Sequence, residues 1–384
     1  MKQRGVTEAL GIQVDRPLFS IVISCYNSRS TLGRLLDSLC WQGLEKKEYE
    51  IIISDDHSTE SYEDIINLYK DKLNIVRTST EYNCCPSNTR EAGAQAASGV
   101  WLTFSDHDDV FYPGALQKLK DEYLLNPEFT EEYYIVTSFR EIEEKSGTVI
   151  REHIAESSGG WTHGKFYNMD KLWKPFNIHY LKDLKSHEDI YITCTINCIL
   201  HHLNQNGIKA GSNLNDLFTY VWYHRPTSQS HAIEPNQTDF LHRHFIDYIK
   251  ASGEVYFEQY YKGVLDEAYT RSLLIDSIML CYFYSESFIF KYPTTYNKEN
   301  FTYLKDYIKR IKNTFGINNN FIWQYEAGNQ AYGYVEAEKN ARIATGGIIP
   351  HLTFIDWLDL LASDGDVHKP KSIFYEKGFK EINE

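Results

Sequence analysis

The sequence has no long apolar run, few cysteines and no excess of positive charge, and each lack excludes a class of protein. Because no stretch of about 18 apolar residues occurs, we expect no transmembrane helix. The 7 cysteines are an odd number in 384 residues, which predicts reduced thiols rather than a disulfide framework or a zinc site. The formal net charge of -14 argues against broad, sequence-independent nucleic-acid binding, although a local basic patch stays open.

The first 17 residues lack the apolar core of a secretory signal peptide, and the chain has no internal repeats. We therefore expect a cytoplasmic protein, with peripheral association at the membrane left open. The length suggests two domains, and the pattern changes near residue 238. We expect one domain over residues 1–238 and a helical domain over residues 239–384 that binds acceptor or mediates homo-oligomers.

An acidic cluster, Asp106-His107-Asp108-Asp109, follows an apolar run over residues 100–105 that predicts a buried strand. Three carboxylates this close repel one another unless a cation lies between them. Oxygen ligands suit Mg²⁺ or Mn²⁺, and open α/β sheets bind ligands at the carboxyl ends of their strands. The cluster therefore predicts a metal-bridged diphosphate. The alternative is an acidic, solvated turn.

Strands and helices alternate around this cluster. Apolar runs predict strands over residues 19–24, 49–54, 74–77 and 100–105, and helical spacing predicts helices near residues 32–39, 61–70, 86–98 and after Pro113. This order predicts a mostly parallel, doubly wound α/β sheet with right-handed crossovers. Further on we expect strands over 133–139 and 217–224, a helix over 187–204, and helices within 239–263, 265–290 and 299–314.

Several of these segments form an ordered series of motifs. They are residues 20–27, 52–59, 90–99, 104–109, 163–167, 187–189 and 223–225, with Ser228 and Ser230. The series resembles the GT-A-fold glycosyltransferases of family 2 over about residues 18–232. The resemblance implies a Rossmann-like GT-A fold and inverting, metal-dependent transfer from a nucleotide sugar, UDP-linked in our interpretation. The region from residue 238 onward resembles no family that we recognise.

The resemblance also implies roles for the donor residues. Asp55 would accept a hydrogen bond from the base, and the backbone of Cys25 and Tyr26 would contact the nucleoside. Arg90 would lie at the nucleotide, and His107 fills the variable position of the Asp-x-Asp motif. From the residues alone, helix capping by Asp55 or Asp56 and a solvated helix arginine at position 90 are the alternatives.

Metal and catalytic roles follow from the same resemblance. Asp108 would ligate Mn²⁺ or Mg²⁺ directly, Asp106 would reach the ribose or the metal, and Asp109 would support the loop or the sugar. Asp189 matches the catalytic base, with Glu188 orienting the site. Arg225 would bind the diphosphate, and Trp161, His163 and Lys165 would line the acceptor side. The alternatives are a helix-terminal charge at Asp189 and an ordinary polar linker at Arg225.

The sequence departs from the family pattern at His57, Glu91 and His107. None of these departures removes an acidic group, so only the donor specificity is in doubt. A nucleotidyltransferase is a rival, but residues 24–30 lack its Gly-rich, basic phosphate loop. A non-catalytic nucleotide-sugar binding module is another rival. We expect the acceptor to be a surface glycan; other hydroxyl acceptors, including hydroxymethylated DNA bases of phage type, stay open.

Overall fold

The computed structural model describes residues 16–124, 132–156, 159–225, 247–248, 250–274, 277 and 298–315. The chain divides into two units, residues 1–232 and residues 233–384. Among the described residues, no helix combines the length and the apolar character that crossing a membrane requires. Ser228 and Ser230, which belong to the series of motifs, lie outside the described residues.

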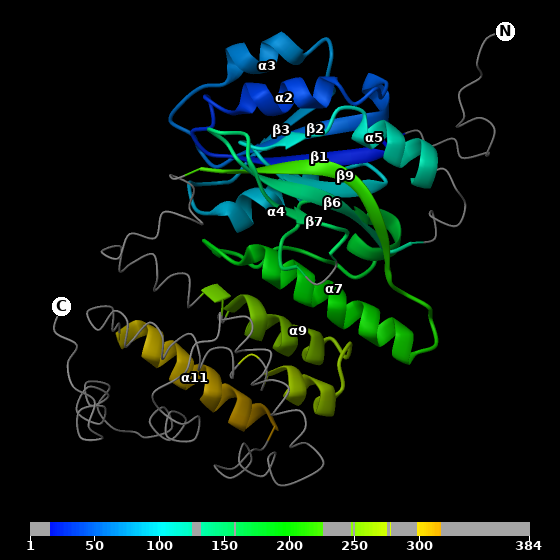
Figure 1. The fold of residues 1–384 in the computed structure, drawn as a ribbon. Helices are drawn as coiled ribbons and strands as arrows, with labels where there is room; N and C mark the ends of the chain where they lie inside the picture. Colours follow the sequence, from blue (N-terminus) through cyan, green and yellow to red (C-terminus); the bar gives the residue numbers. More distant parts are fainter. Residues whose placement is uncertain are drawn as a thin grey trace. The chain divides into compact units, whose positions relative to one another are not determined.

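The first unit is built on a mixed sheet whose first four strands are parallel, in the order β3-β2-β1-β4. These strands are β1 (Phe19–Cys25), β2 (Tyr49–Asp55), β3 (Ile75–Ser79) and β4 (Trp101–Asp106). The connecting helices are α2 (Leu32–Cys40), α3 (Glu63–Tyr69) and α4 (Pro86–Ala96). Helices α2 and α3 cover one face and α4 the other (Figure 1). The expected α/β architecture is confirmed, and its crossovers bring the strand ends together at one edge.

The remaining strands mix the two orientations. They are β5 (Val110–Phe111), β6 (Tyr134–Glu143), β7 (Val149–His153), β8 (Lys165–Asn168) and β9 (Ser212–His224). Strand β8 runs antiparallel between β4 and β6, β9 is parallel to β6, and β5 and β7 pair antiparallel with β9 and β6. The expectation of a mostly parallel sheet thus holds for β1–β4. Strands β5 and β8 were not expected, because strands of 2 and 4 residues are too short to show a hydrophobic pattern.

Short helical elements and a long helix complete the unit. They are α5 (Ala115–Lys118), the π-helical turns Leu119–Leu124 and Met169–Trp173, and α7 (Glu188–Gln205). Helix α7 confirms the helix expected over residues 187–204. Its first turn matters for function, because it carries Glu188 and Asp189.

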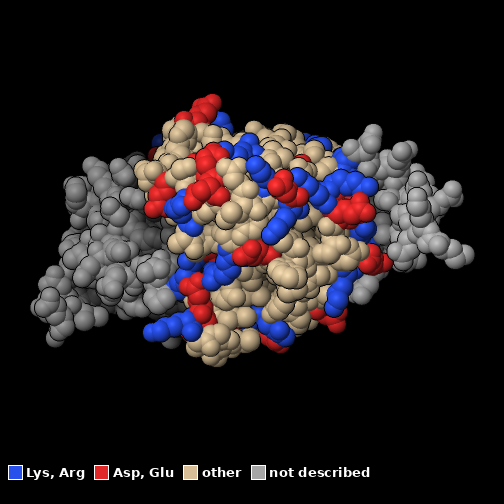
Figure 2. All heavy atoms as spheres, turned by 90° about the horizontal axis from the view of Figure 1, so that it is seen from above, with Lys and Arg blue, Asp and Glu red and all other residues tan. Residues whose placement is uncertain are grey.

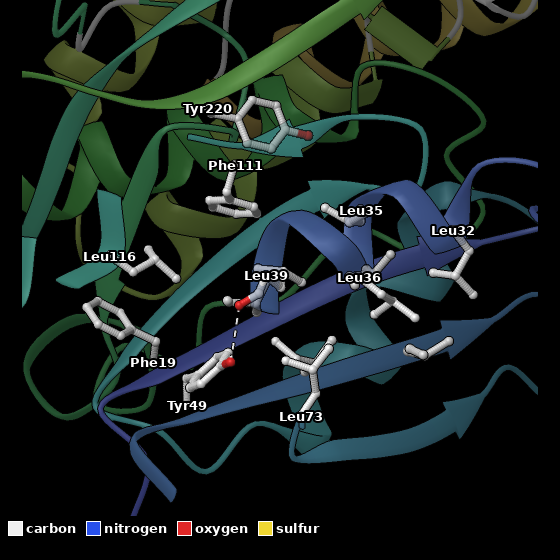
Figure 3. Close-up of a cluster of buried hydrophobic side chains, with 14 of the residues drawn as sticks. Phe19, Leu32, Leu35, Leu36, Leu39, Tyr49, Leu73, Phe111, Leu116 and Tyr220 are labelled. Carbon is white, nitrogen blue, oxygen red and sulfur yellow. Dashed lines mark hydrogen bonds between the residues drawn. The ribbon is translucent and has the colours of Figure 1, made fainter. Parts of the chain in front are cut away.

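The core on the α2 side is made of leucines at helical spacing. Leu32, Leu35, Leu36 and Leu39 are fully buried against the sheet (Figure 3). Tyr49 on β2 packs into the same cluster, and its hydroxyl donates to the Leu39 carbonyl at 3.1 Å. Burial of one such leucine contributes roughly 1.5–3 kcal/mol. The helix is therefore fixed on the sheet by packing, because its N-cap residue, Thr31, makes no side-chain cap hydrogen bond.

On the opposite face, α4 approaches β1 so closely that only glycine fits at position 93. A Cβ atom there would lie 2.3 Å from Cγ1 of Val22. We expect Gly93→Ala to lower the free energy of unfolding by about 1–3 kcal/mol, because overpacking outweighs the gain in helix propensity. Gly33→Ala on α2 is the matched control, since its Cβ would meet only the Tyr69 hydroxyl at 3.9 Å. Equal urea midpoints for the two variants would contradict this packing.

The described part of the second unit is helical. A π-helical turn, Lys250–Glu254, leads into α9 (Val255–Tyr261), residues 267–274 are helical, and α11 spans Lys298–Phe315. Arg310 of α11 donates to both Glu254 oxygens at 2.7 Å, and its guanidinium lies 4.0 Å from the centre of the Phe257 ring. Helices thus occur where helical periodicity is expected. The aromatic segment 282–290 lies outside the described residues.

Candidate functional site

The candidate site lies where β1, β2 and β4 end. Strand β1 is central, and its register places Cys25 beside Asp55 on one neighbour and Ser24 beside Asp106 on the other. The carboxyl ends of parallel strands therefore bring two of the predicted carboxylates to the same edge, as the sequence pattern indicates.

Asp55 is fixed by donors that follow it in the chain. It accepts hydrogen bonds from the Ser58 amide at 3.2 Å, the Ser58 hydroxyl at 2.6 Å and the Tyr62 hydroxyl at 2.6 Å. The helix-capping alternative is wrong, because α3 begins only at Glu63 and its N-cap residue is Tyr62. Asp56 instead accepts from Thr80 Oγ1 at 2.9 Å and the Cys84 amide at 3.1 Å.

Cys25 and Tyr26 differ in what they expose. Cys25 is buried, and burial raises the pKa of its thiol to about 12, so it stays neutral. Its side chain therefore offers no charge to a ligand. Tyr26 is 49% exposed, which leaves its ring open to stacking.

The three carboxylates of the acidic cluster lie close together. Asp106, Asp108 and Asp109 each offer a carboxylate oxygen, and these oxygens lie within 4.8 Å of one another. Asp109 is buried and accepts from the Tyr220 hydroxyl at 2.7 Å and the Tyr223 amide at 2.8 Å. Burial raises the pKa of Asp109 well above its usual value. Asp109 therefore holds the loop to β9, whereas Asp106 and Asp108 are partly exposed.

Arg90 joins three elements at the centre of the site. One guanidinium nitrogen donates to Asp106 at 2.6 Å, and another contacts a Glu188 oxygen. Burial opposes ionisation of Asp106, but attraction to Arg90, His163 and His107 and the hydrogen bond from Arg90 together outweigh it and lower the pKa. Burial raises the pKa of Glu188 to about 7 in spite of Arg90. The solvated-arginine alternative is wrong, since Arg90 is only 7% exposed and packs between two carboxylates.

Asp189 lies in the first turn of α7, next to Glu188. Its carboxylate accepts from the Thr162 amide at 3.3 Å and the Thr162 hydroxyl at 3.1 Å. Both Arg90 and His163 interact electrostatically with Asp106 and with Asp189. The predicted base and the predicted metal ligands thus belong to one site. Thr162 gave no signal in the sequence, because a single threonine in a loop is unremarkable.

Two arginines contact Asp108 of the acidic cluster. Arg225, after β9, pairs with the Asp108 carboxylate. Arg34 on α2 donates to the Asp108 carbonyl and to Glu144, the latter at 2.7 Å, and its guanidinium lies 4.4 Å from the Tyr223 ring centre. Sequence reasoning missed Arg34, because the periodicity of a helix marks only its apolar positions.

His107 turns away from the strand end toward α2. Its Nδ1 lies 2.8 Å from the Thr31 hydroxyl, and burial lowers the pKa of the imidazole to about 4. The histidine is therefore neutral near pH 7. Its contact with α2 supports the loop that carries Asp106 and Asp108.

The residues expected on the acceptor side form part of an aromatic cluster. His163 stacks on Tyr220 with ring centres 5.4 Å apart, and Trp161 stacks on His163 at 6.4 Å. Lys165 is buried, and its ammonium donates to the Gly159 carbonyl at 2.7 Å. Lys165 therefore supports the Gly159–Trp161 turn and presents no charge to solvent.

Lys165 gives the protein a specific pH dependence. Burial lowers its pKa from 10.5 to about 8, so between these values the unfolded chain binds a proton that the folded chain does not. The free energy of unfolding then rises with pH, by up to roughly 3 kcal/mol at about 1.4 kcal/mol per pH unit. We expect the stability of wild type relative to Lys165→Met to rise by this amount between about pH 7 and pH 10.5. A difference that is constant with pH in denaturant titrations would contradict the assignment.

The surface over α2 and α3 carries both signs of charge. Figure 2 shows Lys and Arg interspersed with Asp and Glu on this face. Exposed pairs such as Arg29–Asp64, at 2.5 Å, and Arg77–Glu63 lie on it. Such pairs contribute little stability, but the mixture leaves no broad basic field on this face for nucleic acid.

Comparison with known proteins identifies the region that contains this site. Residues 20–188 match the family model described as Glycosyl transferase family 2. The chain is 40% identical over 99 residues to the poly(ribitol-phosphate) beta-glucosyltransferase of Bacillus spizizenii, covering 25% of this chain and 16% of that protein. It is 35% identical over 92 residues to the poly(ribitol-phosphate) beta-N-acetylglucosaminyltransferase TarS of Staphylococcus aureus, covering 24% of this chain and 16% of that protein. The matched segment thus spans about a sixth of each relative.

Solved structures extend the likeness of fold. Staphylococcus aureus TarS 1-349 in complex with UDP-GlcNAc superposes with a TM-score of 0.54 and 18% identity, over 85% of this chain and 92% of that one. Its complex with UDP gives a TM-score of 0.51. Together with the family match, this likeness confirms the expected GT-A fold.

Proposed function

We propose that this chain, whose residues 20–188 match the model of glycosyl transferase family 2, is an inverting glycosyltransferase. It would transfer a sugar from a UDP-linked donor to an acceptor hydroxyl. The observation that carries the proposal is the position of Arg90, which binds both Asp106 and Glu188 beside Asp189. One buried cation thereby joins the predicted metal ligands to the predicted base.

The donor nucleoside would bind across the ends of β1 and β2. Asp55 is held by Ser58 and Tyr62, so its carboxylate is oriented before a ligand arrives. A carboxylate acceptor suits the N–H of a uracil imide. The backbone at Cys25 lies beside Asp55 in the strand register. Together with the exposed ring of Tyr26, the next residue in the chain, it would complete the nucleoside site. The UDP bound in the TarS structures supports this choice of base.

Asp106 and Asp108 would hold Mn²⁺ or Mg²⁺ with the donor diphosphate. Their partly exposed carboxylates fit such an ion, because hard divalent cations take oxygen ligands and leave positions for phosphate. A bound ion would supply Lewis-acid stabilisation of the leaving diphosphate. Arg225 and Arg34 lie beside these aspartates, and a guanidinium suits phosphate oxygens.

Asp189 would act as the general base. A bond forms between the acceptor oxygen and the anomeric carbon while the bond to the diphosphate oxygen breaks, and the acceptor proton passes to Asp189. One displacement inverts the configuration. Thr162 orients the base with two hydrogen bonds, and Arg90 positions the neighbouring Glu188. Position matters more here than basicity, since a carboxylate is a weak base.

The proposed donor class can be tested without knowing the acceptor. The chain is incubated with Mn²⁺ and a panel of UDP-, GDP- and dTDP-sugars, and released nucleoside diphosphate and thermal shift are measured. We expect UDP-sugars to give the largest stabilisation and slow hydrolysis. A chain that binds no nucleotide sugar contradicts the proposal. Release of pyrophosphate from nucleoside triphosphates would favour the nucleotidyltransferase instead.

We place the acceptor among surface glycans or related hydroxyl-bearing polymers, and the two relatives compared above are named for such a polymer, poly(ribitol-phosphate). A hydroxymethylated DNA acceptor is less favoured by the formal net charge of -14. We assign the second unit to acceptor binding or to homo-oligomers through its aromatic helices. Light scattering tests the oligomer role, and a monomer at micromolar concentration leaves acceptor binding and a purely stabilising role as the alternatives.

A further inference from the structure

Two adjacent cysteines and an aspartate form a second group of ligand atoms outside the proposed active site. Cys84 and Cys85 follow β3, and their Sγ atoms lie 3.2 Å apart. Asp183 Oδ1 lies 3.1 Å from Cys84 Sγ. One ligand atom from each residue lies within 4.8 Å of the other two, an arrangement that within the described ranges occurs elsewhere only in the acidic cluster.

The surrounding contacts hold these ligands in place. Asn88 on α4 donates to Cys84 Sγ and to Asp183 Oδ1, both at 3.1 Å, and its own oxygen accepts the Asp183 amide at 3.0 Å. The Ser87 hydroxyl accepts the Leu184 amide at 3.0 Å. Two segments about a hundred residues apart in sequence are therefore joined at the thiols. Cys85 is buried, Cys84 is partly exposed and Asp183 is exposed, so the group can be reached from solvent.

A disulfide does not suit this pair. Consecutive Cα atoms lie about 3.8 Å apart across a trans peptide, whereas disulfide-bonded residues usually have Cα atoms about 4.4–6.8 Å apart. Closing the bond would require the backbone to move, and the hydrogen bond from the Cys84 amide to Asp56 holds it. Burial also raises the pKa of Cys84, so oxidation through a free thiolate is disfavoured.

We propose that Cys84, Cys85 and Asp183 bind a thiophilic divalent cation of the zinc class. Zn²⁺ binds thiolate at about 2.3 Å and carboxylate at about 2.0–2.2 Å in tetrahedral geometry. Around such an ion, two sulfur ligands lie roughly 3.8 Å apart, and a sulfur and an oxygen ligand lie roughly 3.5 Å apart. Small side-chain rotations would bring the observed separations to these values. On binding, each thiol releases one proton to solvent, and a water completes the shell.

The ion would brace the two sides of the proposed active site. The loop after β3 is tied through the Cys84 amide to Asp56, the neighbour of the base-binding Asp55. Asp183 lies on the segment that leads into α7, whose first turn holds Glu188 and Asp189. An ion that links Cys84 to Asp183 therefore connects the proposed nucleoside site to the helix turn that carries the proposed general base. It differs in chemistry from the oxygen-only cluster at residues 106–109.

The test is a titration of the full chain with Cd²⁺, and separately Zn²⁺, in excess Mg²⁺ and a phosphine reductant. Cadmium–thiolate bonds absorb in the ultraviolet, which distinguishes sulfur ligands from the acidic cluster. We expect one equivalent of Cd²⁺ to bind with this absorption. Cys84→Ser and Cys85→Ser should weaken binding by more than about 100-fold and remove the absorption, and Asp183→Asn should weaken it by about 10–100-fold.

Cys194 provides the matched control. Cys194 and Cys198 lie one turn apart on α7, and in the described part of the chain no third ligand joins them. Cys194→Ser should bind Cd²⁺ like wild type. The proposal is overturned if the absorption survives in Cys84→Ser, if it disappears in Cys194→Ser, or if Cd²⁺ binds without it. Because Asp183 is exposed, Asp183→Asn keeps the test decisive even if a serine variant misfolds.

Discussion

Replacing Asp189 with asparagine should lower kcat by about 10²–10⁴-fold, the usual contribution of a general base. Asparagine has the same shape and keeps an oxygen for the hydrogen bonds from Thr162, but it cannot take the acceptor proton. Affinity for the UDP-sugar with Mn²⁺ should change little, because Asp189 is assigned to proton transfer alone. Single-turnover kinetics and calorimetry separate the two quantities.

A control decides between a base and a helix-terminal charge. Asp266 precedes the helical residues 267–274 in the second unit, and its carboxylate accepts from the Tyr269 amide at 2.7 Å. Asp266→Asn should change stability by less than about 2 kcal/mol and leave kcat unchanged. If Asp189→Asn behaves in the same way, with near-wild-type turnover, the base lies elsewhere.

Replacing Asp108 with alanine should abolish the metal dependence of nucleotide binding. In wild type we expect Mn²⁺ to tighten UDP binding by roughly 100-fold, equivalent to about 2.7 kcal/mol. The variant loses a ligand oxygen and also frees Arg225 from its ion pair, so UDP should bind equally well with Mn²⁺ and with EDTA. Titration calorimetry in both conditions measures the difference.

Asp109→Asn separates a ligand from a supporting residue in the same cluster. The Asp109 carboxylate is used by Tyr220 and Tyr223, so this variant should keep most of the metal dependence while losing stability. The assignment fails if Asp108→Ala retains metal-dependent binding, or if Asp109→Asn alone abolishes it.

The parallel half of the sheet was predictable because its strands are buried on both faces. Such strands form continuous apolar runs, and β1, β2 and β4 begin and end within a residue or so of the runs that predict them. The pairing of β9 with β6 was not predictable. It depends on contacts between segments far apart in the chain, and a hydrophobic pattern carries no information about which strand lies beside which.

The carboxylates of the site could be found in the sequence, but their partners could not. Asp106, Asp108 and Asp189 stand in local motifs. Arg34 and Thr162 reach the site across 74 and 27 residues, and nothing near them in the sequence marks them. Arg90 shows the limit most clearly, because a pattern of polar and apolar residues cannot distinguish a solvated arginine from one buried between two acids.

The contacts of Asp109 with β9 also set an order of events during synthesis. Tyr220 and Tyr223 emerge 111 and 114 residues after Asp109. At about 5–20 residues per second, the nascent chain carries its unsupported acidic loop for roughly 5–20 seconds before β9 can close over it. During that interval β6 also lacks its parallel partner β9, so one edge of β6 is open to pairing with other chains. Substitutions in β9 should therefore lower the yield of folded protein from the ribosome before they lower the activity of the molecules that do fold.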